Sequence, residues 1–177
     1  MLKYCKILDE ETGLVQLGVG CSDEYYIAIG MQLRDVEQSE KDFNWYITEK
    51  CPHKTKEEKL EDKRVEKFFE NETKRETFLM QGVEYKGILF DSDLEQKINI
   101  MATVQVMDEQ ETITWVGKDG VTSLVCDKYD LLAIGGLLSN MTTYVWQIRN
   151  PEIKTKIENA KTIEELDAID ISYEMGA

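Results

Sequence analysis

The stretch "WVGKDGVTSLVCDKYDLLAIGGLLSNMTTYVWQI", residues 115–148, decides how the second half of this chain folds. In its first part, apolar and polar residues alternate with a period of two on either side of the tetrapeptide "GKDG". Asp-Gly is a strong turn signal, so we predict a β-hairpin. A Walker-type phosphate loop needs Ser or Thr after its lysine and then a helix, whereas Lys118 precedes Asp119 and a strand follows Gly120. We therefore expect no nucleotide at this turn.

The rest of the stretch predicts a long core helix beginning near Asp127, because apolar residues recur at intervals of three and four. That stripe comprises Leu131, Ile134, Leu138, Met141, Val145 and Ile148, and Leu132, Leu137 and Tyr144 widen it. Two helical glycines, Gly135 and Gly136, cost about 1 kcal/mol each relative to alanine. We expect another element to approach them closely, most simply the strands of the same domain. Asn150-Pro151 is expected to stop or kink the helix.

The residues flanking this stretch complete an α+β domain over residues 78–177, which we expect to fold alone. "FLMQGVEYKGILF" predicts two short strands, and Asp91 or Ser92 is expected to begin a helix. The side of that helix expected to be apolar carries Leu94, Ile98, Met101, Val104 and Gln105. After Pro151 we predict another short helix, a capping box at Thr162 and Glu165, and a short polar tail.

The opening residues 1–50 predict a small β-rich module. "LKYCKIL" and "LVQLGVG" form a hairpin, Ser22 caps a short helix that Gly30 ends, and "MQLRDVEQS" pairs with "WYITE". Trp45, Tyr46 and Ile47 are expected in the core or at its seam.

Residues 51–77 predict a charged connector helix between the two modules. Residues 54–76 hold eight basic and eight acidic residues, and Thr55 with Glu58 forms a capping-box pattern. Two interpretations stay open: an exposed connector docked only by its C-terminal end, or a helix that pairs with a partner chain. On the second, Phe68 and Phe69 are candidate partner anchors. The fold class is therefore α+β, with β-hairpins packed on one long and one shorter helix in residues 78–177.

Composition narrows the function classes. The net charge of −14 and the pI near 4.5 disfavour binding to nucleic acid and to anionic membranes. The run "LLAIGGLL" is far shorter than the roughly 20 apolar residues that cross a bilayer, and the N-terminus lacks the apolar core of a signal peptide. We therefore expect synthesis in the cytosol.

The residues that could perform chemistry are few. The four cysteines lack a C-x-x-C pair and are expected to be free thiols in a reducing compartment. We do not expect a zinc site formed by Cys5, Cys21, Cys51 and His53. Only one residue separates the cysteine and the histidine of "CPH", which is a poor spacing for two zinc ligands. Asp91 with Asp93 could bind a divalent ion or act as catalytic carboxylates, but we expect these residues to cap a helix. The sequence thus predicts no catalytic, cofactor or metal site.

Two segments carry a family resemblance. "GVEYKGILFDSDLEQKINI" and "TITWVGKDGVTSLVCDKYDLLAIGGLLSNMTTYVWQIRNPEIKTKIENAKTIEELDAI" resemble an uncharacterised domain at the C-terminal end of phage and prophage tail-fibre and tail-assembly proteins. The shared order is a strand pair ending in F-D-x-D, a helix, a W-x-x-x-D-G hairpin, a long helix and A-x-T-x-E-E-L, over residues 82–169. More loosely, "SEKDFNWYITEKCPHKT" looks like the opening of small tail-fibre assembly proteins.

This resemblance implies a non-enzymatic accessory of a phage tail's receptor-binding apparatus that binds a tail-fibre or baseplate protein. Its role would be that of a fibre-assembly chaperone or fibre-attached protein in the host cytoplasm, or of a structural subunit kept in the virion tail. A small enzyme using a carboxylate pair is a third hypothesis. Homo-oligomerisation stays open, no cofactor is expected, and the candidate partner-binding residues are Phe68, Phe69 and Trp45.

Overall fold

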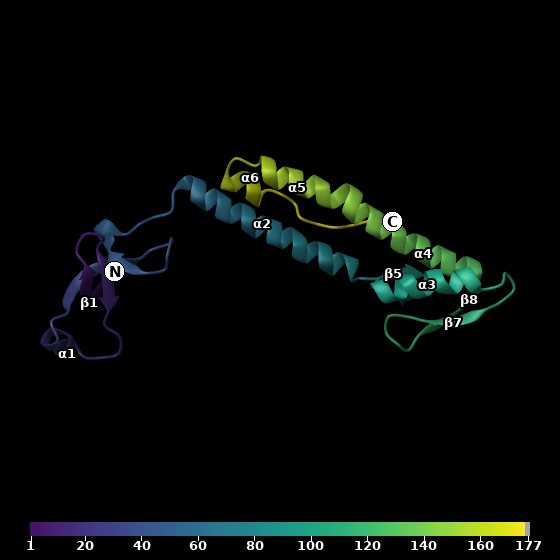
Figure 1. The fold of residues 1–177 in the computed structure, drawn as a ribbon, viewed down its shortest axis with the longest axis horizontal. Coiled ribbons are helices and arrows are strands. Elements are labelled where there is room, and N and C mark those ends of the chain that lie inside the picture. The colour runs from purple at the N-terminus through teal and green to yellow at the C-terminus, as the bar shows by residue number, and fades with distance from the viewer. Residues whose placement is uncertain (176–177) are drawn as a thin grey trace. The chain divides into compact units, whose positions relative to one another are not determined.

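A computed structural model describes residues 1–175 and confirms the α+β fold class (Figure 1). The strands are β1 (Leu2–Asp9), β2 (Leu14–Leu17), β3 (Gln32–Gln38), β4 (Trp45–Ile47), β5 (Val83–Tyr85), β6 (Ile88–Phe90), β7 (Ile113–Val116) and β8 (Ser123–Cys126). The helices are α1 (Asp23–Ala28), α2 (Lys56–Leu79), α3 (Leu94–Val106), α4 (Lys128–Thr143), α5 (Asn150–Asn159) and α6 (Ile163–Asp167), with a 3-10 turn η1 (Thr48–Lys50) and a π-helical turn η2 (Tyr144–Arg149).

The chain divides into two units, residues 1–59 and residues 60 onward. We predicted boundaries near residues 50 and 78 around a separate connector. In the structure α2 crosses the boundary between the units, and the residues of α2 from Leu60 on belong to the second.

The first unit is a four-stranded antiparallel barrel with strand order β1-β2-β4-β3. The two predicted hairpins are present, and pairing of β1 with β3 and of β2 with β4 closes the barrel. Its interior is small and centres on Cys5, Val15 and Val36, with Trp45 and Ile47 packed against them. Closure leaves no unpaired sheet edge in this unit, which a single pair of hairpins would expose.

The predicted caps of the first unit are present. The Ser22 hydroxyl accepts a hydrogen bond from the Tyr25 amide at the start of α1, and Gly30 has a positive φ of 78° just past its end. At the start of α2, Thr55 and Glu58 form a reciprocal capping box. These caps could be predicted from the sequence because each capping side chain bonds to a backbone group only three residues away.

In the second unit α2 lies antiparallel to η2 and α5 (Figure 1). Arg64 donates to the carbonyls of Ile157 and Ala160 near the end of α5, while Asn71 bonds Asn150 at its beginning. The expectation that α2 docks only by its C-terminal end is therefore wrong. The helix contributes to the core along its whole length from Leu60.

A buried hydrogen-bonded cluster joins α2, α5 and the C-terminal segment. The Asn71 amide donates to Asn150 Oδ1 at 2.9 Å, and the Tyr173 hydroxyl donates to Asn71 Oδ1 at 2.7 Å. Ile171 is buried nearby, and Arg149 donates to the Ser172 carbonyl. The expected polar tail thus packs as part of the core, because Ile171 and Tyr173 are buried and Tyr173 stacks on Phe78 of α2.

The core stripe of α4 is confirmed from Leu131 to Val145, but Ile148 is 59% exposed. The cause is η2, in which the Asn150 amide bonds to the Val145 carbonyl five residues back. A π-helical turn inserts one residue, so the buried stripe resumes at Asn150 and continues through Ile153 and Ile157. Pro151 does not end the helix, since this wide turn precedes it.

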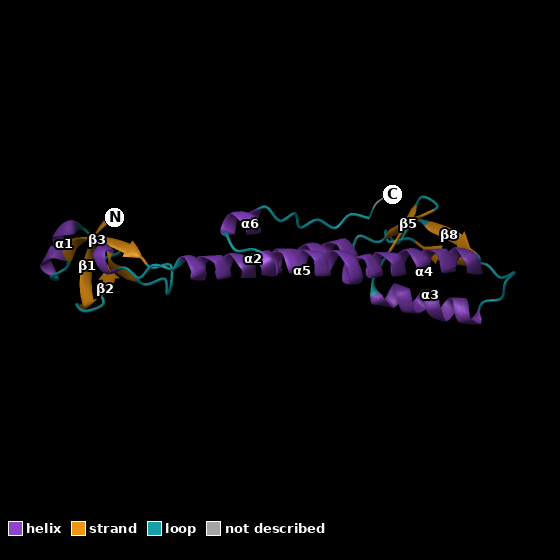
Figure 2. Ribbon diagram, turned by 90° about the horizontal axis from the view of Figure 1, so that it is seen from above, coloured by secondary structure: helices purple, strands orange, loops and turns teal. Residues whose placement is uncertain are grey.

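Helix α3 lies beside α4 (Figure 2), and Leu94, Ile98 and Met101, which the sequence placed on one side of α3, are exposed. Asp93, one or two residues later than expected, caps the helix, and Ile100 is its buried residue. The element that approaches Gly135 is α3 and not a strand: a β-carbon on Gly135 would lie 3.4 Å from Ile100 Cγ2. Apart from its chain neighbours and the backbone of its own helix, nothing in the described chain lies within 4 Å of such an atom on Gly136.

Candidate functional site

The three predicted partner-binding residues lie in different environments. Phe68 is half-buried and packs against the core of the second unit, and Trp45 packs against the barrel core. Phe69, the next residue of α2, is 69% exposed. It lines a shallow groove with Val65, Arg75 and Lys154. Of the three, Phe69 is the most exposed.

A second apolar surface lies on α3 and consists of Leu94, Ile98 and Met101, here called the α3 apolar face. Their exposed fractions are 72%, 54% and 64%. The spacing i, i+4, i+7 aligns them on one side of the helix. Leu94 and Met101 also line a groove of about 430 Å³ between α3 and α4 whose lining includes Gly135. The sequence placed these three residues on one side of the helix, together with Val104 and Gln105, and the structure leaves Leu94, Ile98 and Met101 exposed.

The turn at "GKDG" is stabilised by contacts within the protein. Asp119 accepts hydrogen bonds from the Val121 and Thr122 amides, both at 2.9 Å, and Gly120 has a φ of 71°. Lys118 donates to the Met80 carbonyl and lies 3.5 Å from Asp91. The predicted hairpin is confirmed, and its lysine and aspartate bond to groups of the chain itself.

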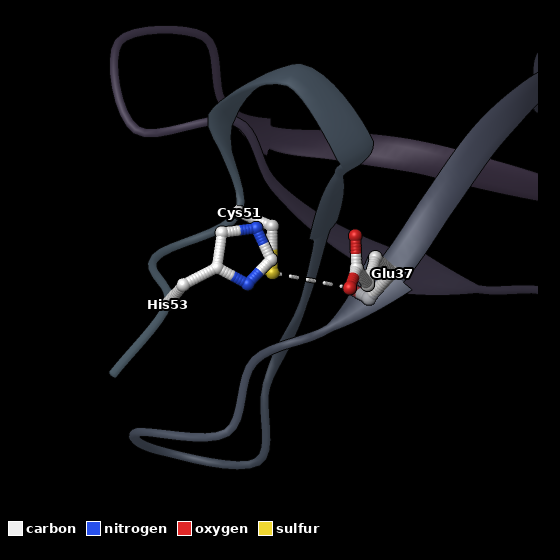
Figure 3. A group of neighbouring side chains, drawn as sticks. All are labelled: Glu37, Cys51 and His53. Carbon is white, nitrogen blue, oxygen red and sulfur yellow. Dashed lines mark hydrogen bonds between the residues drawn. The ribbon is translucent and has the colours of Figure 1, made fainter. Parts of the chain in front are cut away.

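Three side chains of chemically different kinds converge in the first unit (Figure 3): Glu37, Cys51 and His53. Their donor atoms, a carboxylate oxygen, a thiol sulfur and an imidazole nitrogen, all lie within 4.8 Å of one another. Glu37 comes from the end of β3, whereas Cys51 and His53 come from the segment after η1. Cys51 is buried, Glu37 half-buried and His53 exposed, so the group opens to solvent at the imidazole.

The surroundings of this group are acidic. Burial raises the pKa of the Cys51 thiol, and the charges of Glu37, Asp42 and Glu40 raise it further. Tyr46 donates to Asp42 and holds the pKa of that carboxyl at about 2. The Lys59 ammonium, 2.8 Å from Glu40, lowers the pKa of Glu40. The thiol is therefore protonated at neutral pH and faces several negative charges.

From the sequence, Cys51 and His53 were weighed as zinc ligands together with Cys5 and Cys21. Cys5 lies in the barrel core and Cys21 is exposed, and neither belongs to the group. Glu37 was missed because 35 acidic residues give no signal by which to select one. The Asp91 and Asp93 carboxylates have local partners: Asp93 caps α3, and Asp91 accepts from the Ser92 amide at 2.8 Å.

Comparison of the sequence with protein-family models finds no match, and comparisons with curated proteins and with solved structures find none either. Among the residues that the structure describes, no helix is both long and apolar enough to cross a membrane.

Proposed function

We propose that this chain is a non-enzymatic accessory of a phage tail receptor-binding apparatus and acts by binding a tail-fibre or baseplate protein during assembly. The observation that carries the binding role is the α3 apolar face, three large side chains aligned on one helix and open to solvent. The phage context rests on the sequence resemblance over residues 82–169.

The geometry of the α3 apolar face suits a helical partner. Burying three large apolar side chains yields about 1.5–3 kcal/mol each relative to exposure, before the costs of association. An amphipathic helix laid along such a face uses the same i, i+4, i+7 spacing in return. The adjoining groove, lined by Gly135 and Leu138 of α4, has room for side chains of the partner.

Phe69 provides a second contact on a different part of the unit. It lies one turn from the exposed Val65 on α2, and Arg75 stacks over the Trp146 ring at 4.6 Å close by. Exposed aromatic side chains such as Phe69 and Trp146 are enriched at protein interfaces, whereas Arg75 is itself buried. Phe68, by contrast, supports the fold.

A pull-down of the co-expressed fibre chain tests the binding role. The double variant Leu94→Ser/Ile98→Ser should keep the parent's melting behaviour and lose most of the captured fibre, because neither side chain is buried in the free protein. Val121→Ser is the matched control, an exposed apolar residue in the hairpin turn. Full capture by the double variant would refute the α3 apolar face as the binding surface.

Quantitative mass spectrometry of purified particles separates the two phage roles. An assembly chaperone is depleted from mature particles, whereas a structural subunit is present in fixed ratio to the fibre. We expect depletion. A stoichiometric amount would replace the chaperone by the virion subunit, and absence of any association with the fibre would refute both.

A further inference from the structure

The convergence of Glu37, Cys51 and His53 carries an inference that is independent of partner binding. We propose that these three side chains bind one zinc-type divalent ion, with water in the fourth coordination position. The site lies wholly within the first unit, between the end of β3 and the segment that leads into α2.

Distance is the first argument for a site. Three atoms that are mutually within 4.8 Å share a central point at most about 2.8 Å from each, which is 4.8 Å divided by the square root of three. Zinc needs about 2.0–2.2 Å to nitrogen and oxygen and about 2.3 Å to sulfur. The donors must therefore close in by less than about 1 Å each. Side-chain rotation supplies this, because His53 is exposed and Glu37 is only half-buried.

The backbone explains how a Cys-x-His pair serves as two ligands despite its short spacing. Cys51 has φ −63° and ψ 124°, an extended conformation, and in an extended chain residues i and i+2 point to the same side. Pro52 between them restricts its own φ and favours an extended residue before it. The sequence argument against "CPH" rested on its short spacing and did not consider this extended conformation.

The segment is also fixed in place. The hydroxyl of Ser39, a buried residue, donates to the Pro52 carbonyl at 3.0 Å and so fastens the link between the two ligands to the end of β3. Beyond His53, the capping box of α2 and an ion pair between Lys59 and Glu40 anchor the following residues. A metal site gains affinity when its ligands need little ordering.

The donor set selects the kind of ion. A thiolate, an imidazole and a carboxylate together match zinc and its close analogue cobalt, whereas magnesium and calcium take oxygen ligands. Binding would release the Cys51 thiol proton to solvent and place a thiolate on the metal. The ion's two positive charges would balance this thiolate and the Glu37 carboxylate. The protonated thiol now donates weakly to the Glu37 carbonyl, at 3.9 Å, a contact that binding replaces.

Cobalt titration of the full chain tests the proposal, because thiolate ligation gives a near-ultraviolet charge-transfer absorption. We expect one Co²⁺ per chain, this absorption, and its displacement by Zn²⁺ but not by excess Mg²⁺. Cys51→Ser should abolish the absorption. His53→Gln and Glu37→Gln should each weaken Zn²⁺ binding by more than about tenfold.

Two features keep the test decisive. Because His53 is exposed, His53→Gln should leave the fold intact even if Cys51→Ser disturbs the barrel. Cys21→Ser is the matched control, since it removes an exposed thiol from the same unit. The proposal fails if His53→Gln binds Zn²⁺ like the parent, if Cys21→Ser removes the absorption, or if Mg²⁺ displaces the ion. The last result would indicate diffuse binding to the acidic surface.

Discussion

Replacing Asn71 by alanine should lower the free energy of unfolding by about 3 kcal/mol. Asn71 is 1% exposed and makes two hydrogen bonds, one to Asn150 and one from Tyr173. Without its amide, Asn150 Oδ1 loses its closest donor and the Tyr173 hydroxyl loses its closest acceptor, and each buried hydrogen bond contributes about 0.5–1.5 kcal/mol. The lost volume adds a cavity term. The Tyr173 hydroxyl keeps an acceptor, since it already lies 3.4 Å from Asn150 Oδ1.

Urea unfolding followed by circular dichroism measures this effect, and the melting temperature should fall by about 10 °C. Tyr173→Phe removes only the hydroxyl and should cost about 1.5 kcal/mol. The double variant should show a coupling energy of about 1 kcal/mol, because both changes remove the Asn71–Tyr173 bond. Asn140→Ala is the matched control, an exposed asparagine on α4, and should change stability by no more than about 0.5 kcal/mol.

The reasoning is refuted if Asn71→Ala costs no more than Asn140→Ala. It is refuted equally if the effects of Asn71→Ala and Tyr173→Phe simply add. Either result would mean that the cluster of Asn71, Asn150 and Tyr173 forms without stabilising the contact between α2 and the C-terminal segment.

Three further predictions follow from the second unit. Hydrogen bonds from Lys86 and Tyr85 lower the pKa of Asp130 in the folded protein. The carboxylate therefore contributes its full stabilisation of the fold above its unfolded pKa of about 3.9, and this stabilisation is lost as the pH falls through the folded pKa. Asp130→Asn should therefore lower the free energy of unfolding by about 1–2 kcal/mol at pH 7 and by progressively less below about pH 4. Urea unfolding at a series of pH values measures this, and a loss that does not depend on pH would contradict the prediction. Residues 55–177 should melt cooperatively and residues 78–177 should not, because α2 supplies part of the core; equal calorimetric transitions would restore the boundary at 78. Lys118→Ala should leave the thermal shift with ATP or GTP unchanged, and a nucleotide stabilisation that this variant abolishes would overturn the hairpin interpretation.

The sequence by itself determined the local elements. Ser22, Thr55, Asp127 and Thr162 all cap helices, and Asp119-Gly120 forms the expected turn. Each of these signals acts over two to four residues, so its energetics is nearly complete without knowledge of the fold. The α+β class followed from the order of these elements.

Only the tertiary structure decided which apolar faces are buried. The periodicity of α3 allows either side to pack, and contact with α4 selected Ile100 over Leu94, Ile98 and Met101. The π-helical turn before Pro151 likewise moved the stripe of α4 and α5 by one residue, which left Ile148 exposed. The periodicity of a helical sequence indicates that one face is apolar, but it does not indicate which element covers that face.

The candidate metal site and the closed barrel depend on contacts between residues distant in sequence. Glu37 and Cys51 meet because β3 pairs with β4 and η1 then returns the chain to the end of β3. The sequence showed Cys51 beside His53 but could not single out one carboxylate among 35 acidic residues. Long-range strand pairing brought that carboxylate to the thiol. Such a pairing depends on the packing of the whole barrel and not on any local signal, so the sequence alone did not predict it.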